Sequence, residues 1–436
     1  MSLRLLLVIV LVHSCYFSKA QTSTSLGGLT AFTGTSNYSK NIGSTGNIIT
    51  PVNSSQYIIF HESIQTSANG TAIVATFSGK NVTALGSGVS LGPMLGKRCV
   101  RLDDNIVVFC FTDQSNKTIY LQVGTVSGTG SSATVTLGTK LTTSHKTSYF
   151  AITPLSKTQF LLAWEDDLTN DIGKVVVGSI SGTGSSASVS LHTSQVFENN
   201  DIKRLSIDTL SSQKFVIAYC DDDNDNGECI VGTVSGNSIS INASSETILY
   251  SSSEVVGISA MAISSEQFVV SYGEGASSGL GKARIGTVSG TTITLSSSTY
   301  SFTSSSVVNN QSFGVAMDYD EVVIGYTDGS NGKYKVGKVS GSGTSASISF
   351  SSANTFATSY YGELKIARIS EDEFAFGWML ATGSLTNYGL WAGGTKIGSG
   401  DFDGFTIPPE IKITGNSTEI VDGDVTPSTS DHTDFG

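Results

Sequence analysis

GTVSG, at residues 232–236, is a short phrase that returns along this 436-residue chain. Its copies end at glycines spaced by roughly 50 residues, a period typical of β-propeller blades and other repeat arrays. The other copies are ATFSG at 75–79, GTVSG at 124–128, GSISG at 178–182, GTVSG at 286–290 and GKVSG at 337–341. The repeat therefore indicates the architecture more strongly than any single motif.

Each repeat reads as four short antiparallel strands, most clearly around residues 232–236. The expected strands are IKRLSIDTL (202–210), KFVIAYCD (214–221), GECIVGTVSG (227–236) and NSISINASSETIL (237–249). The second strand is apolar along nearly its whole length in other copies too, such as YIIFHE (57–62), FLLAWED (160–166) and FVVSYGE (268–274). Such runs indicate burial on both faces, and four strands in series make one propeller blade.

Seven second strands of this kind predict an all-β, seven-bladed β-propeller of four-stranded antiparallel blades over residues 21–409. The last repeat, 361–398, lacks the Ser-Gly phrase. We expect the N-terminal strand GGLTAFTGTSNYS (27–39) to close the ring, because closure removes exposed sheet edges and this segment is similar to the other fourth strands. The alternative is closure by DFDGFTIP (401–408).

The repeat resembles units of extracellular and tail-associated proteins of marine bacteria and their phages, in which a VVIAY-Asp strand, an Asn/Gly loop and VGTVSG follow one another. This resemblance covers residues 48–397 and implies a repeat-built β protein. The tail, 410–436, resembles the opening of the choice-of-anchor D Ig-like domain of secreted proteins. The matching residues are Gly415-Asn416, Ile420 to Asp424, Thr426-Pro427-Ser428 and Thr433 to Gly436. Because an Ig-like sandwich needs about 100 residues, we expect a disordered tail that is the truncated start of such a domain.

Residues 1–20 have the pattern of a secretory signal peptide. Arg4 precedes the apolar stretch Leu5–Val12, and a small-x-small cleavage pattern ends at Ala20. The apolar stretch is shorter than the roughly 20 residues that a membrane helix needs, so we expect a secreted, extracellular protein without a membrane span. Eight glycosylation sequons agree with this route. They lie at Asn37, Asn53, Asn69, Asn81, Asn116, Asn242, Asn310 and Asn416.

Charge and cysteine content narrow the class further. The chain has 36 acidic and 24 basic residues, a formal net charge of −12, and no basic stripe. Nucleic acid is therefore not an expected partner. Separately, we expect the protein to be a monomer. Beyond the signal peptide lie Cys99, Cys110, Cys220 and Cys229. An even number in a secreted chain suggests disulfides; Cys99–Cys110 and Cys220–Cys229 are the simplest pairing, although other connectivities exist.

The loops between second and third strands carry a concentration of acidic residues. They are expected to lie on one face of the disc, together with the connections between blades. The densest is CDDDNDNGEC (220–229). We predict an acidic ligand-binding face, which would attract cations or basic partners. Its candidate residues are Asp166, Asp167, Asp221, Asp222, Asp223, Asp225 and Glu228.

Part of this loop matches the first half of a calcium-binding loop. Asp222, Asn224 and Asn226 alternate before Gly227, and they are the candidate calcium ligands. The loop is not an EF-hand, because the twelfth position would be Thr233, inside a strand. The structural alternative is that an acid at this place in nearly every repeat accepts hydrogen bonds from turn amides, with Cys220–Cys229 stapling the hairpin.

No catalytic constellation stands out. The histidines beyond the signal peptide are scattered, at His61, His145, His192 and His432, and no Gly-x-Ser-x-Gly motif accompanies them. The sequence therefore predicts a secreted, non-catalytic recognition or adhesion propeller that binds glycan or protein through the acidic loop face, with calcium as an optional aid. The alternatives are a purely structural extracellular scaffold and a carbohydrate-active enzyme with a hidden pair of carboxylates.

Overall fold

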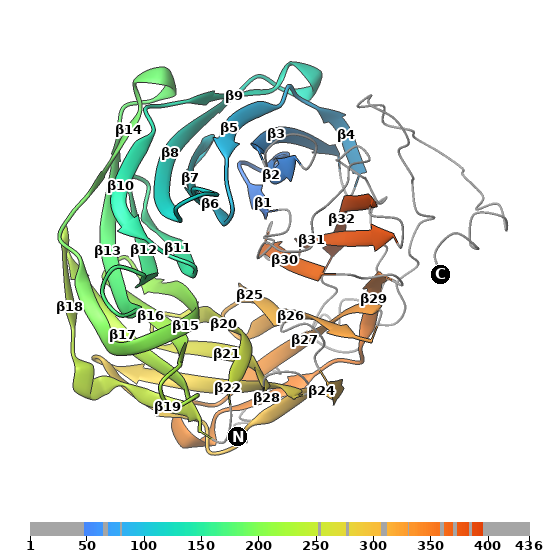
Figure 1. Cartoon of the computed structure of the whole chain (residues 1–436). Helices are drawn as coiled ribbons and strands as arrows, with labels where there is room; N and C mark the ends of the chain where they lie inside the picture. Colours follow the sequence, from blue (N-terminus) through green and yellow to red (C-terminus); the bar gives the residue numbers. More distant parts are fainter. Residues whose placement is uncertain are drawn as a thin grey trace, which may run out of the picture.

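The chain is an all-β propeller whose antiparallel sheets succeed one another around a ring (Figure 1). The structure, a computed structural model, describes residues 48–395 except 64–68, 79–80, 252–253, 276–278, 307–311, 330, 358–361, 369–372 and 383–385. The expected signal peptide, both candidate closing segments and the tail lie outside these residues. Within the described part, no helix has the length and hydrophobicity that a membrane crossing requires.

The first two sheets contain five strands each, the last two of which pair with the same third strand. The first contains β1 (Ile48–Pro51), β2 (Gln56–Ser63), β3 (Asn69–Ser78), β4 (Asn81–Leu85) and β5 (Val89–Pro93). The second contains β6 (Lys97–Asp103), β7 (Ile106–Thr112), β8 (Thr118–Ser127), β9 (Thr134–Leu137) and β10 (Leu141–Lys146), with the short turn η1 (Gly130–Ser132) between β8 and β9.

The next sheet consists of two successive meanders joined through one long strand. The first meander contains β11 (Phe150–Ser156), β12 (Gln159–Asp166), β13 (Ile172–Ser181), η2 (Gly184–Ser186) and β14 (Ser188–Leu191). The second contains β15 (Gln195–Ser211), β16 (Lys214–Asp221), β17 (Gly227–Ser235), β18 (Ser238–Ile241), η3 (Ala243–Ser245) and β19 (Thr247–Tyr250). The start of β15 pairs with β13 and its end pairs with β16.

The remaining sheets complete the ring. One contains β20 (Val255–Ser264), β21 (Gln267–Glu274), β22 (Leu280–Ser289), β23 (Thr292–Leu295) and β24 (Tyr300–Ser306). The next contains β25 (Ser312–Asp318), β26 (Glu321–Asp328), β27 (Asn331–Ser340), η5 (Gly343–Ser345), β28 (Ser347–Phe350) and β29 (Asn354–Ala357). The last contains β30 (Gly362–Arg368), β31 (Glu373–Thr382) and β32 (Thr386–Thr395).

The first strands β1, β6 and β11 lie toward the centre of the ring, whereas β4, β9 and β14 lie toward its rim (Figure 1). Neighbouring first strands contact one another around the ring, and β1 contacts β30. Ile49, Tyr57 and Ile59 of the first sheet pack with Ala375 of the last in one buried cluster. The described ends of the ring therefore meet through apolar contacts.

The second strands are the centres of their sheets, as the apolar pattern predicted. β16 coincides with the expected segment 214–221, and every residue after Lys214 is buried. The expected fourth strand, 237–249, is instead broken into β18 and β19. β17 pairs with 238–241 near its end and with 247–250 near its start, which leaves residues 242–246 outside the ladder. The Asn242 side chain accepts a hydrogen bond from Ser244 N (3.3 Å) and caps η3 in this break.

Two requirements of the backbone explain the glycines of GTVSG. Gly232 lies directly opposite Phe215, and a Cβ on Gly232 would sit 2.2 Å from the Cζ of that ring. Gly178 and Gly286 face Phe160 and Phe268 in the same way. The final glycine turns the chain: Gly236 has φ +59°, a conformation that glycine adopts without steric cost.

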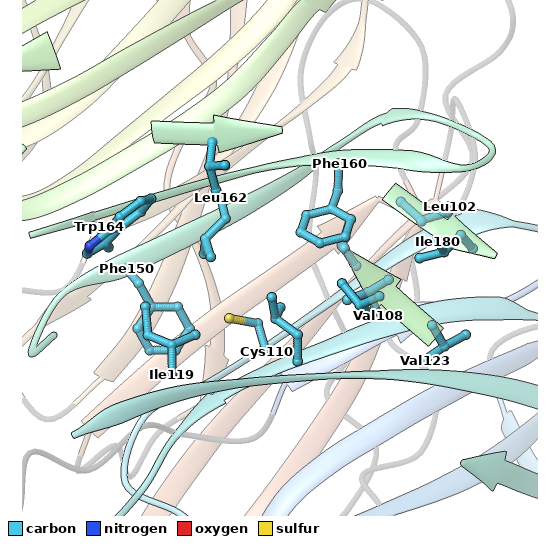
Figure 2. Packing of buried hydrophobic residues seen from close by; sticks show 14 of the residues in the cluster. Leu102, Val108, Cys110, Ile119, Val123, Phe150, Phe160, Leu162, Trp164 and Ile180 are labelled. Atoms are coloured by element: carbon cyan, nitrogen blue, oxygen red, sulfur yellow. The ribbon is translucent and has the colours of Figure 1, made fainter. Parts of the chain in front are cut away.

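Buried apolar side chains fill the spaces between neighbouring sheets. Figure 2 shows one such cluster, in which Val108 and Cys110 of β7 pack with Phe160, Leu162 and Trp164 of β12. Residues two apart along a strand share a face, so the two faces of each central strand contribute to different clusters. Stacking of the blades through these clusters provides the rigid frame that holds the loops.

Candidate functional site

The loop between β16 and β17 is organised by Asp221. Asp221 N donates to Asn226 O (2.9 Å), and the Asp221 carboxylate accepts from Asp223 N (2.9 Å) and Asn224 N (3.3 Å). Asp222 N donates to Asp201 O (2.8 Å), so the loop lies beside the chain that enters the same blade. Asp221 therefore has the turn-shaping role that the structural alternative gave to this position.

The structure divides the seven predicted ligand-binding acids into buried and exposed groups. Asp166, Asp221 and Glu228 are 3%, 1% and 3% exposed, so their side chains lie inside the protein and not on an exposed acidic face, which corrects the prediction for these three residues. Asp167 is half-buried. The exposed acids are Asp222, Asp223 and Asp225, at the tip of the loop. Asp166 and Asp221 are buried because they end the central strands β12 and β16. Glu228 is buried because it lies near the start of β17, which pairs with β16.

A resident lysine neutralises part of the loop. Lys203 Nζ forms ion pairs with Asp222, with Glu254 (3.0 Å) and with Asp225 (3.7 Å). Arg204, whose φ is +52°, pairs with Glu254 as well. Burial opposes the charge of Glu254, but these two bases hold the pKa of its carboxyl below the usual range.

The three candidate calcium ligands have separate partners in the structure. Asp222 pairs with Lys203. Asn224 Nδ2 donates to Asp221 Oδ2 (2.9 Å), and Asn226 Nδ2 donates to Glu228 Oε1 (3.2 Å). The structure does not gather these side chains around one centre, because the hairpin directs Asn224 and Asn226 toward different buried acids.

The repeats share an ion pair that the sequence did not reveal. The acid at the end of the second strand pairs with a lysine near the start of the third strand. The pairs are Asp166–Lys174, Glu274–Lys282 (3.7 Å) and Asp328–Lys333. Each lysine lies directly across the ladder from a buried aromatic residue, respectively Trp164, Tyr272 and Tyr326. In the β15–β19 blade the aromatic residue is Tyr219, and its cross-strand partner is Glu228 instead of a lysine.

Glu228 belongs to a buried group of three carboxylates. One oxygen each of Glu198, Glu228 and Glu246 lies within 4.8 Å of the other two. Glu198 comes from the start of β15, Glu228 from the start of β17 and Glu246 from the residue after η3. Glu198 accepts hydrogen bonds from Asn199 N (2.7 Å), Asn200 N (2.9 Å) and Tyr219 Oη (3.1 Å).

Burial, followed by the proximity of Glu246, raises the pKa of the Glu228 carboxyl to about 8. Burial also raises the pKa of Glu198. Among the residues that the structure describes, no Lys, Arg or His forms an ion pair with any of these three acids. Sequence reasoning missed Glu198 and Glu246, and the signal that could have found the group is the lysine-to-glutamate change at position 228.

A second acidic group lies on the β11–β14 blade. Glu165, Asp167 and Asp171 also bring carboxylate oxygens within 4.8 Å of one another. Here a base is present: Lys117 Nζ lies 2.9 Å from Asp167 Oδ2. Glu165 accepts hydrogen bonds from the backbone of Ser148 (3.2 Å) and Tyr149 (3.1 Å). Burial, followed by the charges of Asp167 and Asp171, raises the pKa of Glu165 to about 8.

Replacing Glu165 with glutamine is expected to stabilise the protein increasingly as the pH rises from about 4.5 to 8. The folded pKa of Glu165 lies above its unfolded value, so its favourable contribution is complete below about pH 4.5 and is lost as pH rises toward 8. Glu165→Gln should match the parent near pH 4.5 and exceed it by on the order of 2 kcal/mol at pH 8. Denaturant unfolding across this pH range measures the difference.

The matched control is Glu266→Gln, an identical change at an exposed turn position. Its unfolding free energy should follow the parent at every pH. A difference between Glu165→Gln and the parent that stays constant from pH 4.5 to 8 would contradict the titration of Glu165.

The structure contradicts both expected disulfides, since Cys99, Cys110, Cys220 and Cys229 are free thiols. Cys99 pairs across the ladder with Phe109, whereas Cys110 pairs with Arg98. This offset of one residue points the two thiols to opposite faces of the sheet. Cys229 lies opposite Ala218 and Cys220 lies opposite Gly227, so these two share a face but are diagonal neighbours. In both hairpins the strand register, and not the sequence spacing, determines whether the two cysteines face each other.

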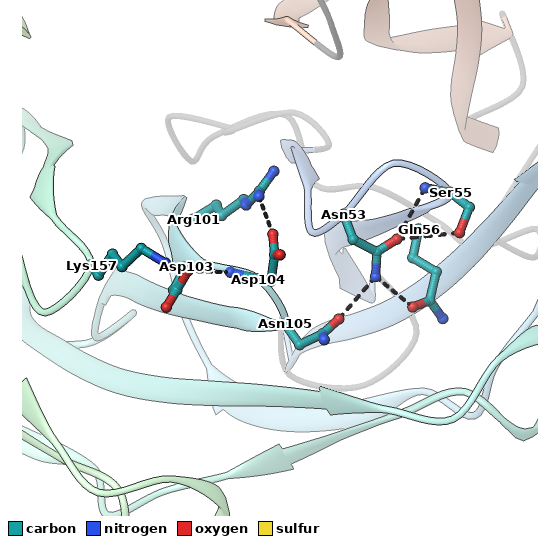
Figure 3. A network of polar contacts seen from close by, with 8 residues as sticks. All are labelled: Asn53, Ser55, Gln56, Arg101, Asp103, Asp104, Asn105 and Lys157. Carbon is teal, nitrogen blue, oxygen red and sulfur yellow. Dashed lines mark hydrogen bonds and ion pairs between the residues drawn. The ribbon is translucent and has the colours of Figure 1, made fainter.

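The sequons occupy different environments. Asn116 and Asn242 are exposed, and Asn69 is half-exposed. Asn53 is half-buried in a polar network at the turns between first and second strands (Figure 3). Its Nδ2 donates to Gln56 Oε1 (2.8 Å) and Asn105 Oδ1 (2.9 Å). The nitrogen that a glycan would occupy at Asn53 is therefore engaged in joining two neighbouring blades.

Comparisons with known proteins find no sequence family and only distant structural likeness. No protein-family model matches the chain, and no curated protein matches it. Similar solved structures include a mutant of AofleA from Arthrobotrys oligospora (TM-score 0.44, 8% identity, 76% of this chain and 91% of that chain). Others are the fucose-specific lectin from Aleuria aurantia (0.41, 8%, 78% and 97%) and prolyl oligopeptidase B from Galerina marginata (0.45, 10%, 80% and 48%).

Proposed function

We propose that the chain is a secreted, non-catalytic recognition or adhesion propeller of seven blades. The blades are β1–β5, β6–β10, β11–β14, β15–β19, β20–β24, β25–β29 and β30–β32. The ligand is an extracellular glycan or protein that the acidic loops of the β11–β14 and β15–β19 blades bind. Basic groups on that ligand, such as amines or a lysine-rich segment, fit the charge of these loops.

One observation carries this proposal: acids from two neighbouring blades meet on one edge. The pKa of Asp201 is raised by partial burial and then by the charges of Asp171 and Asp223. Asp171 belongs to the β12–β13 loop and Asp223 to the β16–β17 loop. Ile202 N donates to Asp171 O (3.0 Å) and Asp222 N donates to Asp201 O (2.8 Å), so the two loops flank one segment of β15 and form one acidic surface. Asp223 and Asp225 are exposed at its outer side. Complementary charge on a partner would speed association and set specificity.

Removing two exposed acids from this edge should weaken ligand binding. Asp223→Asn/Asp225→Asn keeps side-chain size, and it leaves the turn-forming Asp221 in place. Binding to a glycan array that includes amine-bearing glycans, and to a panel of lysine-rich peptides, should fall by roughly tenfold for the ligand that the parent selects. The parent's binding should also weaken with added salt, since exposed charges are screened.

The matched control is Asp104→Asn/Glu266→Gln, which removes two exposed acids from turns between first and second strands. It should change binding less than about twofold, because these turns are at the opposite edge of the sheets from the proposed ligand. Equal binding by the parent and the Asp223→Asn/Asp225→Asn variant would reject the acidic loops as the binding surface.

A purely structural extracellular scaffold is the second candidate function, and one observation favours it. Asp166 and Asp221 are buried and bound within their own hairpins, so part of the acidic pattern serves the repeat. A protein that binds none of the array glycans and peptides, with both double variants behaving as the parent does, would support the scaffold.

A further inference from the structure

We propose that Glu198, Glu228 and Glu246 form a buried calcium-binding site between the β11–β14 and β15–β19 blades. The site differs from the calcium loop that the sequence suggested, because Asp222, Asn224 and Asn226 do not belong to it. It extends the recognition function proposed above without depending on it, since metal binding is measured on the protein alone.

The first argument comes from the internal repeat. In three other blades a lysine ammonium group lies at the position of Glu228 and pairs with the acid that ends the second strand. In the β15–β19 blade both positions are acidic, Asp221 and Glu228. In those blades the lysine side chain places a positive charge beside the acid, whereas these two positions of the β15–β19 blade carry only negative charge. A bound cation would restore the charge balance that the other blades obtain from lysine.

The second argument is an oxygen without a partner. Glu228 is 3% exposed, and its Oε2 is buried without a hydrogen-bond donor. A buried carboxylate oxygen in this state is costly unless it meets a proton or a cation. The same carboxylate has an oxygen within 4.8 Å of Glu198 and Glu246 oxygens. The unpartnered group is thus directed into the acidic cluster and not away from it.

The donor set selects a hard cation. All three side chains offer carboxylate oxygen, and calcium takes six to eight oxygen ligands in flexible geometry. The Glu198 oxygens already accept hydrogen bonds from Asn199 N, Asn200 N and Tyr219 Oη, which orient the carboxylate while leaving further lone pairs for a metal. Glu246 is half-exposed, so it provides the path by which an ion reaches the buried pair.

The acidic group on the neighbouring blade differs in having a lysine paired with one of its acids. Glu165, Asp167 and Asp171 also bring carboxylate oxygens within 4.8 Å of one another, but Lys117 Nζ lies 2.9 Å from Asp167 Oδ2. Glu198, Glu228 and Glu246 have no ion pair of this kind among the described residues. The two clusters therefore differ in whether a lysine of the protein pairs with one of the acids.

Calcium at this site would connect the blades and fix the acidic loop. Glu198 lies on the part of β15 that pairs with β13, whereas Glu228 and Glu246 belong to the next blade. Asn226, the last residue of the loop, donates to Glu228 Oε1 (3.2 Å). An ion held by Glu228 would therefore restrain the base of the loop that presents Asp223 and Asp225.

Metal binding to the full protein is the test. After treatment with EDTA, 1 mM CaCl₂ should raise the melting temperature by several degrees at pH 7.5. Terbium ions should bind saturably and emit under tyrosine excitation, because Tyr219 Oη lies 3.1 Å from a Glu198 oxygen. Calcium should displace the terbium. Magnesium at the same concentration should have a smaller effect, since it requires strict octahedral geometry.

Variants separate this site from adventitious binding. Glu228→Lys restores the residue type of the other repeats, so it should fold and should lose both the calcium-induced shift and at least about nine-tenths of the terbium emission. Glu228→Gln, which keeps the size of the side chain, should weaken calcium binding at least tenfold. Glu266→Gln, which removes an exposed acid at the β20–β21 turn, should leave both signals unchanged.

Two results would overturn the proposal. One is a parent protein whose melting temperature and terbium emission do not respond to calcium. The other is terbium emission that persists in Glu228→Lys. If stability instead rises as pH falls from 8 to 5 and calcium has no effect at either pH, the three acids share a proton only. None of these outcomes changes the result of the glycan and peptide binding experiment.

Discussion

Gly232→Ala should destabilise the protein by about 3 kcal/mol, although it adds a single methyl group. The new Cβ would lie 2.2 Å from Cζ and 2.7 Å from Cε1 of Phe215. Phe215 is fully buried between blades and cannot swing away without displacing its neighbours. The unfolding free energy from urea denaturation measures the loss.

Two companion variants identify the cause. Gly236→Ala changes the final glycine of the same phrase, where a Cβ would meet nothing within 4 Å but φ is +59°. It should cost only about 1–2 kcal/mol of backbone strain. Gly232→Ala/Phe215→Leu makes room for the added methyl group and should recover part of the loss. A double variant less stable than the sum of its single changes would contradict the proposed clash.

Trp164→Ala should cost about 3–5 kcal/mol, the range of large-to-small changes in a packed core. Trp164 is fully buried and packs in the cluster that joins β7 and β8 to β12 (Figure 2). Its ring lies 4.6 Å from that of His145, centre to centre. Removing the indole leaves a cavity between two blades, so thermal unfolding should occur at a clearly lower temperature.

Trp164→Phe is the control for this variant. Trp164 Nε1 is buried without a hydrogen-bond partner, so its loss strands no acceptor. Phenylalanine retains most of the apolar contact and should cost roughly 1 kcal/mol. If the alanine and phenylalanine variants lose equal stability, the cluster is not the source of the effect.

The sequence predicts the repeat and the central strands of the fold but not every outer strand. A period of roughly 50 residues identifies a repeat array, and central strands are recognised because burial on both faces demands continuous apolar runs. β16 matches its prediction at both ends for this reason. The fourth strand was mispredicted, since the break at 242–246 depends on which residues of β17 find partners.

The candidate site was less accessible to sequence reasoning. An acid at the end of a second strand is visible in the sequence, but its exposure is not. Asp221 and Asp223 are two residues apart in one acidic run, and the first is buried while the second is exposed. The difference arises because Asp221 still belongs to the central strand β16, whereas Asp223 lies beyond the end of the ladder.

The sequence by itself determined the repeat, the all-β architecture and the place of each central strand, because these follow from local periodicity. Only the tertiary structure decided which charges meet. Glu198 and Glu246 approach Glu228 because β15 crosses from one blade to the next and β19 folds back along β17. Cys99 and Cys110 remain apart because strand register turns their side chains to opposite faces. Contacts across blades and the register within hairpins are long-range properties, and no local pattern specifies them.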